Sequence, residues 1–295
     1  MRLKKTLLAV AALLPMLCAP AYAGLQVDDW KLDTSGVTGQ GLSRVVTGID
    51  EILFTAVTHA TSPSGIGTGL PFFTNGLGVA TQFNNYVPGI IPVPELNVPG
   101  GSGGNPGWEL TFQWTAGGTY GIVIPTVAAF FDHGGAGTIN FYIDNLDDGG
   151  ASVKSNPSTG AGYTDGTKFA SFTLQPGGGG VLSLLTSDGS DDAGWLIDLA
   201  NTLPNVILTS LGNDLGTNPT SDLHTDSNFD ANPIQGTPPF SFVGGGFACG
   251  GVATDFCAKE DGSATLTVPE PASLALLGLG LACMGMFGRR RNKKA

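Results

Sequence analysis

The chain has 295 residues, of which 46 are glycine and 19 are proline. Most basic residues lie near the two ends, so the 246 residues from Gly24 to Pro269 keep five basic and 23 acidic side chains, a net charge near −18. This charge argues against nucleic acid and anionic lipid as partners, because phosphate binding needs clustered Lys and Arg. It favours either plain solubility or the collection of divalent cations. A body of this length can bury one sizeable core.

Residues 1–23 are predicted to be a secretory signal peptide. Three basic residues among the first five positions precede an apolar stretch of 12 residues, which is too short to span a bilayer as a helix. Ala21 and Ala23 then form a small-x-small site for signal peptidase, so the mature chain is expected to begin at Gly24. The alternative is a lipoprotein modified at Cys18, which the large residue before that cysteine disfavours.

Residues 24–267 are predicted to form a single all-β domain, a β-sandwich-like fold with long loops rich in glycine and proline. The clearest strand covers 108–114, where apolar side chains alternate with polar ones and would share one buried face. The other predicted strands are 52–59, 120–127, 138–143, 168–174, 181–185 and 264–268.

Three stretches are predicted to be long polar loops because glycine, proline and aspartate gather in them, namely 65–107, 149–166 and 214–239. Residues 195–203 fit either a short helix, through the spacing of their leucines, or two strands. The sequence shows no fixed-period repeat, which argues against a solenoid or a propeller.

Two clusters of aspartates are candidate calcium sites, since carboxylates beside a turn glycine are ligands that calcium prefers. Their carboxylates are those of Asp144, Asp147, Asp148, Asp188 and Asp192. A third stretch, 222–230, has polar groups at five alternate positions, which would share one face of a strand. The alternative for all three is that Asp, Asn and Gly simply form turns.

The sequence assembles no catalytic group, so a non-catalytic protein is expected. The Gly-Gly-Ser-Gly-Gly run at 100–104 lacks the strand and helix that a nucleophile elbow needs. Asp132 and His133 fit a capped turn at a strand end, or an acid/base pair borne on a turn. The four tryptophans could stack on sugars, but Trp108 and Trp114 fit the pattern of a buried face better.

Cys249 and Cys257 are predicted to form a disulfide, because an even pair of cysteines in an exported domain is usually oxidised. The loop that they close is short, so the expected stabilisation is about 2–3 kcal/mol.

Residues 268–295 combine a short motif, an apolar segment and a basic end. The motif is Val268, Pro269, Glu270 and Pro271, and the two prolines favour an extended backbone. The 17 uncharged residues that follow would span about 26 Å as a helix, just enough for a bilayer core. The basic stop is Arg289, Arg290 and Arg291. Basic residues stay on the cytoplasmic side, so the body would face outward.

This three-part tail resembles the PEP-CTERM sorting signal of Gram-negative bacteria. The resemblance implies export across the inner membrane, transient anchoring by the C-terminal helix and removal of the tail by an exosortase. It also implies a cell-surface or matrix protein associated with exopolysaccharide, of the kind that supports floc or biofilm formation. A permanent single-pass anchor is the alternative for the tail. For the body, the alternatives are a secreted polysaccharide hydrolase and a calcium-stabilised carbohydrate-binding module.

Overall fold

The computed structural model describes residues 24–27, 29–86, 89–150, 152–185, 188–230, 249, 252 and 254–269. The chain divides into two compact units, one of residues 26–267 and one of residues 1–25 with 268–295. The predicted signal peptide and the apolar C-terminal segment lie outside the described residues. Within the described part, no helix is long and apolar enough to cross a bilayer.

The unit of residues 26–267 is almost entirely β-structure, which confirms the predicted fold class. Its main strands are β4 (Glu51–Thr61), β5 (Pro71–Asn85), β7 (Trp108–Ile124), β8 (Ala128–Asn145), β9 (Thr167–Leu174), β10 (Pro176–Ser183), β11 (Asp188–Ile197), β13 (Asp222–Asp230) and β14 (Asp255–Pro269). Two short strands, β1 (Gly24–Gln26) and β6 (Gly89–Ile91), are also present, and β6 pairs with β5.

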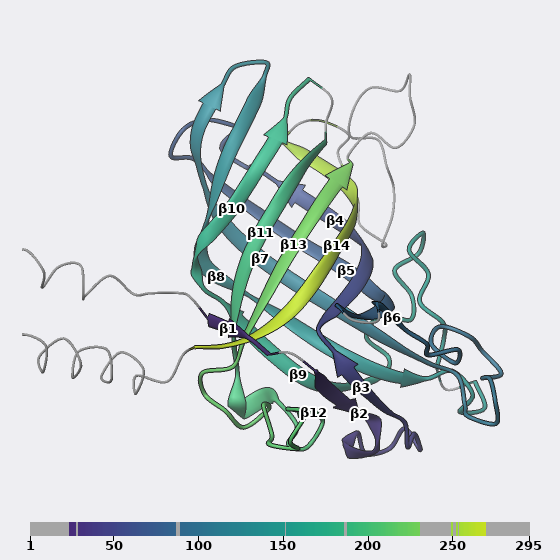
Figure 1. Ribbon diagram of the computed structural model, residues 1–295. Helices are drawn as coiled ribbons and strands as arrows, with labels where there is room; N and C mark the ends of the chain where they lie inside the picture. Colours follow the sequence, from purple (N-terminus) through teal and green to yellow (C-terminus); the bar gives the residue numbers. More distant parts are fainter. Residues whose placement is uncertain are drawn as a thin grey trace, which may run out of the picture. The chain divides into compact units, whose positions relative to one another are not determined.

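The main sheet is one antiparallel meander whose ends meet (Figure 1). β9 and β10 lie end to end and pair with β8 on one side and with β11 on the other, so together they occupy one strand position. β14 then pairs with β4 along ten residues of each strand, from Asp255 opposite Thr61 to Ala264 opposite Ile52. The sheet therefore closes on itself as a barrel, and closure leaves no unpaired edge between its first and last strands.

The predicted sandwich-like arrangement corresponds to two opposite walls of this closed sheet. As in a sandwich, apolar side chains from both walls meet in a common core. The difference is that the β14–β4 hydrogen bonds and the twist of the long strands join the walls into one sheet. The alternation of side chains along each strand thus separates a lumen face from an outer face.

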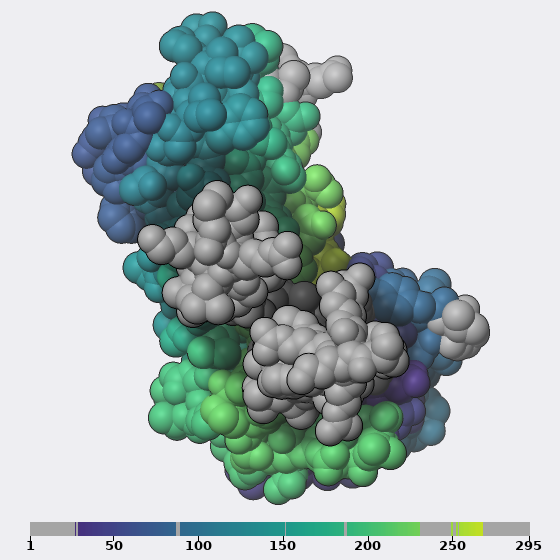
Figure 2. Space-filling model, turned by 60° about the vertical axis from the view of Figure 1, so that its left-hand side comes forward, coloured from purple at the N-terminus to yellow at the C-terminus, as the bar shows by residue number. Residues whose placement is uncertain are grey.

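One end of the lumen is filled by a second, three-stranded sheet, made of β2 (Trp30–Asp33), β3 (Val45–Ile49) and β12 (Ile207–Leu208). Trp30, Leu32 and Ile207 face apolar residues of the main sheet there, including Leu110 and Leu266. We call this the plug end. The opposite end, where short turns join β4 to β5 and β7 to β8, is called the turn end. In Figure 2 the teal β7–β8 hairpin and the green connection from β11 to β13 lie at opposite ends of the molecule.

The predicted strands are found with different bounds. Those at 108–114 and 120–127 belong to the single strand β7, which ends at Ile124, and the one at 181–185 belongs to β10, which ends at Ser183. Two predicted loops are wrong in part, because β5 occupies residues 71–85 of the stretch 65–107 and β13 occupies residues 222–230 of the stretch 214–239. In β5, glycines replace the apolar residues that would have revealed the alternation. A side chain at Gly76 or Gly78 would collide with the ring of Trp114 or Phe112, which fills that space.

The ambiguous stretch 195–203 contains both kinds of structure in short form. β11 continues to Ile197, and a single 3₁₀ turn, η2 (Leu199–Asn201), follows it. The Asp198 carboxylate accepts a hydrogen bond from the N–H of Ala200 and so caps this turn.

Candidate functional site

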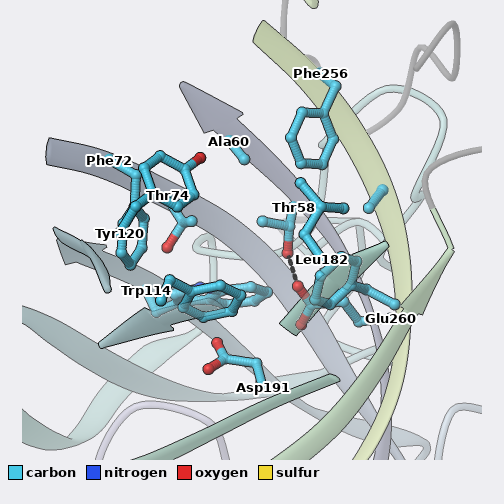
Figure 3. Close-up of a pocket in the computed structure, with 13 residues that line it drawn as sticks. Thr58, Ala60, Phe72, Thr74, Trp114, Tyr120, Leu182, Asp191, Phe256 and Glu260 are labelled. Carbon is cyan, nitrogen blue, oxygen red and sulfur yellow. Dashed lines mark hydrogen bonds between the residues drawn. The ribbon is translucent and has the colours of Figure 1, made fainter. Parts of the chain in front are cut away.

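A small cavity of about 50 Å³ lies in the lumen toward the turn end (Figure 3). Six aromatic side chains from five strands form most of its wall because they occupy lumen-facing positions. These are Phe72, Trp114, Tyr120, Phe131, Phe229 and Phe256. The Tyr120 hydroxyl lies 2.7 Å from the Ser62 hydroxyl. This contact ties the Tyr120 ring to the turn between β4 and β5.

Four polar side chains from four strands meet in the wall of this cavity and of an adjoining hollow of about 30 Å³, which Trp114 also lines. They are Thr58 of β4, His133 of β8, Asp191 of β11 and Glu260 of β14. The Thr58 hydroxyl donates a hydrogen bond to the Glu260 carboxyl, as Figure 3 shows, and Ser227 also bonds to that carboxyl. His133 Nε2 lies 2.8 Å from Asp191 Oδ1.

The electrostatics of this group depend on burial. Removal from water, together with the negative charge of Asp191, raises the pKa of the Glu260 carboxyl to about 8, although the hydrogen bonds from Thr58 and Ser227 act in the opposite direction. Glu260 is therefore mostly protonated at neutral pH. The His133 side chain is 1% exposed, and its Nδ1 has no hydrogen-bond partner. The lumen can thus offer a ligand a carboxylate, a carboxyl proton and an imidazole nitrogen.

The sequence analysis missed this group. It placed Asp132 and His133 at a strand end, which is wrong, because both lie within β8 and the His133 ring points into the lumen. Asp191 lies between the predicted calcium ligands Asp188 and Asp192 but was not itself assigned, and its side chain faces the lumen. In the sequence, these residues could have been recognised as polar side chains at strand positions where the alternation otherwise places apolar side chains.

The outer face of β11 and β13 carries two pairs of aspartates placed directly opposite one another. Asp188 is opposite Asp230, and Asp192 is opposite Asp226. All four side chains are exposed, and His224 Nε2 lies 3.6 Å from the Asp192 carboxylate. Like charges in cross-strand pairs repel one another, so these positions are suited to a bridging cation.

The remaining carboxylate of this outer face comes from β14. Asp261 is exposed and lies opposite Asn228. The alternate polar residues of 222–230 do share one face, as the sequence predicts for a strand. We call the five side chains Asp188, Asp192, Asp226, Asp230 and Asp261 the acidic face.

The other predicted calcium cluster lies at the end of β8, and its carboxylates accept hydrogen bonds from nearby loops. Asp144 accepts from the Ser152 hydroxyl, and Asp148 accepts from the N–H and the hydroxyl of the same serine. Asp147 accepts from two backbone N–H groups of the 100–107 loop. Within the described residues, no three His, Cys, Asp or Glu side chains are grouped to hold a metal ion.

A buried carboxyl also lies next to this cluster. Glu109 of β7 lies opposite Asp144 of β8 and is fully buried. Its carboxyl accepts hydrogen bonds from the N–H and the hydroxyl of Ser155. Burial raises its pKa to about 7, and the charges of Asp144 and Asp165 add to the shift. These contacts fasten the 146–166 connection to the outside of the sheet.

The other candidate residues have structural roles. All four tryptophans are buried, with Trp114 the most exposed at 8%. In the 100–104 run, Ser102 and Asn105 exchange backbone hydrogen bonds across a turn. Cys249 and Cys257 form a disulfide with a Cα–Cα distance of 5.7 Å, and Cys257 lies on β14 beside β4.

The predicted tail begins where β14 ends. Val268 and Pro269 are the last residues of that strand, whereas Glu270, Pro271 and the arginines at 289–291 lie outside the described residues. A family model described as the PEP-CTERM protein-sorting motif matches residues 267–291. No curated protein matches the chain.

Proposed function

Starting from the premise that this chain is a PEP-CTERM protein, we propose that its body is a non-catalytic matrix protein of the exopolysaccharide layer. The motif implies recognition by an exosortase, export and transient membrane anchoring in a Gram-negative bacterium. After processing, the body would remain at the cell surface or in the matrix and support floc or biofilm formation.

The observation that carries this proposal is the acidic face. Five carboxylates on three adjacent strands form a rigid array, and β11 and β13 set two pairs of aspartates directly opposite each other. Divalent cations relieve such repulsion, and hard oxygen ligands favour calcium. A bound cation could also accept oxygen ligands from a polysaccharide, which would join the protein to the matrix.

A secreted hydrolase is the second candidate, because Asp191 and Glu260 line the same cavity and paired carboxyl groups are the usual machinery of glycoside hydrolysis. Against it, aromatic rings from several strands crowd these groups inside the closed sheet, where a polymer chain would have to thread. Release of reducing ends from host exopolysaccharide, absent in Glu260→Gln and in Asp191→Asn, would favour the hydrolase.

The test of the matrix proposal is cosedimentation of the exported protein with exopolysaccharide from its own host. We expect binding in the presence of calcium and its loss with a chelator. The double variant Asp192→Asn with Asp226→Asn should bind about tenfold more weakly, since it removes one opposed pair.

The control is the double variant Asp29→Asn with Asp132→Asn, which removes the same charge from exposed positions away from the acidic face. Asparagine suits the positive φ of 57° at Asp29. Equal losses in both double variants would mean that net charge matters and the acidic face does not. Binding that resists the chelator would support a carbohydrate-binding module that needs no calcium.

A further inference from the structure

We propose that a groove on the outside of the sheet binds a segment of an amino-sugar polysaccharide, through protonated amino groups and hydroxyl groups together. The groove has a volume of about 450 Å³ and lies across the neighbouring strands β5, β4, β14 and β13 (Figure 1). The inference rests on the proposed matrix role and adds to it a class of sugar and a contact that needs no calcium.

The register of the strands gathers polar side chains in this groove. Two outward positions of β14 are each flanked by an outward residue of β4 and one of β13. The resulting rows are Leu53, Ser263 and Asp226 and, beside them, Thr55, Asp261 and Asn228. The volume is in the range of small-molecule sites, which runs from about 300 to 1,000 Å³, so the groove has room for a short sugar segment.

A β-bulge shapes the β5 side of the groove. The register between β4 and β5 shifts after Leu53, and Thr81 is the extra residue of β5 at this point. The Thr81 hydroxyl donates a hydrogen bond of 3.2 Å to the Leu53 carbonyl oxygen. Bulges re-aim side chains and are common beside functional sites. This bulge places an exposed hydroxyl next to the half-buried Leu53 side chain, which can contact the C–H groups of a sugar ring.

The uncharged polar groups of the groove match those of a sugar. Thr55, Thr81 and Ser263 supply hydroxyls, which both donate and accept hydrogen bonds, and Asn228 supplies an amide. Sugar hydroxyls also donate and accept, so the two sets can pair when water leaves. A largely apolar ligand would strip water from these groups without replacing its hydrogen bonds, which is unfavourable.

The charge of the groove selects a cationic sugar. Glu51, Asp226 and Asp261 line it, whereas none of the described residues that line it is Lys, Arg or His. Lys259 is on the same face of β14, but it lies opposite Asp230 and outside the groove. A uronic acid would bring carboxylates against carboxylates, which is costly. A protonated amino group instead forms charge-assisted hydrogen bonds with them.

The spacing of the carboxylates favours a chain over a single ion. Asp261 faces Thr55, which is four residues along β4 from Glu51. From the strand separation and the rise per residue, the Cα atoms of Asp261 and Glu51 lie on the order of 14 Å apart. Calcium holds its ligands at about 2.3–2.6 Å, so one ion is poorly placed to contact both carboxylates. Amino groups repeated along a sugar chain can reach each of them.

The experiment is calorimetric titration of the exported protein with a β-linked glucosamine tetramer in the presence of a calcium chelator. A pH of about 5.5 keeps the amino groups protonated and exposed carboxylates ionised, and about 0.1 M salt screens the net charge of the body. The neutral match is the N-acetylglucosamine tetramer and the anionic match is a galacturonic acid tetramer. We expect the glucosamine tetramer to bind about tenfold more tightly than its neutral match, and the galacturonic acid tetramer not to bind.

Variants locate the site. Glu51→Gln and Asp261→Asn should each weaken binding of the glucosamine tetramer about tenfold, since each removes a charge and keeps the shape. Thr55→Val should weaken the glucosamine tetramer and its neutral match alike, because it removes only a hydroxyl. The control Asp132→Asn removes a charge from an exposed position of β8 outside the groove, and its binding should be unchanged.

The comparison of the three sugars does not depend on any variant folding. Equal affinity for the glucosamine tetramer and its neutral match, binding of the galacturonic acid tetramer, or no binding of the glucosamine tetramer would overturn the proposal. An equal loss in Asp132→Asn and Glu51→Gln would also overturn it, because net charge alone would then attract the sugar.

The proposal and the matrix role can fail separately. Calcium-dependent cosedimentation without tetramer binding would remove the groove as a sugar site and leave the acidic face in its role. Tetramer binding without cosedimentation would remove the matrix role and leave the groove as a sugar site.

Discussion

Glu260 is a carboxyl group placed where its ionised form is poorly tolerated. Its ordinary pKa is 4.5 and its pKa in the folded protein is about 8, because burial and the nearby Asp191 charge both disfavour the ion. The folded state therefore holds a proton that the unfolded chain releases between these two values. The stabilisation linked to this proton is fully present below pH 4.5 and is lost as the pH rises through about 8.

We therefore predict that the domain unfolds at a lower temperature at pH 9 than at pH 6, and that Glu260→Gln reduces this fall. Each unit of pKa shift corresponds to about 1.4 kcal/mol. Buried Glu109, with its pKa raised to about 7, contributes in the same direction over the lower part of the range. Thermal unfolding followed by circular dichroism measures the effect.

The matched control is Asp261→Asn, which changes the next residue of β14 to the same kind of amide on the exposed outer face. It should leave the pH dependence as it is in the unmodified protein. If Glu260→Gln and the unmodified protein lose stability in parallel from pH 6 to pH 9, Glu260 is not the group that titrates.

At the scale of elements, β5 shows how packing can override composition. Gly76 and Gly78 are poor strand residues, yet they lie in the middle of a 15-residue strand. A Cβ at Gly76 would lie 2.1 Å from the Trp114 ring, and one at Gly78 would lie 2.2 Å from the Phe112 ring. The two rings therefore supply the packing on the lumen face that the glycines lack.

Replacing either glycine of β5 with alanine should destabilise the domain by about 1–3 kcal/mol, the usual cost of overpacking a core. Urea unfolding of Gly76→Ala and Gly78→Ala measures this. The control is Gly194→Ala on β11, where the nearest atom to a new Cβ is 4.0 Å away. That variant should be neutral or slightly stabilised, and an equal loss in all three would point to backbone effects rather than collision.

The disulfide restrains the chain just before β14, the strand that closes the sheet. Cys257 is fully buried, and its partner is eight residues earlier in the chain. The double variant Cys249→Ala with Cys257→Ala should lose about 2–3 kcal/mol, since the short loop limits the entropy that the bond removes from the unfolded state. Urea unfolding in the absence of reductant measures the loss. Reduction of the unmodified protein should have a similar effect, and no change in either experiment would contradict a structural role.

Several elements could be predicted because their physics is local. The alternation in 108–114 reveals the start of β7 by itself, and an even pair of cysteines in an exported domain indicates the disulfide. The closure of the sheet could not be predicted, since it depends on β4 meeting β14 some 200 residues later. The lumen site was missed for the same reason, because His133, Asp191 and Glu260 converge only when the sheet is closed.

At the scale of the whole molecule, the match to a known family is confined to the sorting motif. The family model covers residues 267–291 and leaves the body unmatched. The body must therefore be understood from its own surfaces, of which the acidic face and the lumen are chemically distinct.

The sorting signal makes the strongest prediction at this scale. The protein recovered from cells and medium of its own host should have an intact mass that corresponds to a chain from Gly24 to the region of residues 269–271. Replacing Pro269 and Pro271 with alanine should prevent processing, because the motif would no longer be held extended, and the tail should be retained.

The control replaces Pro92 and Pro94, a similarly spaced pair in the β6–β7 connection, and should be processed normally. An unmodified protein that keeps residues 272–295 would identify the tail as a permanent anchor, and the proposed matrix role would lose its main support.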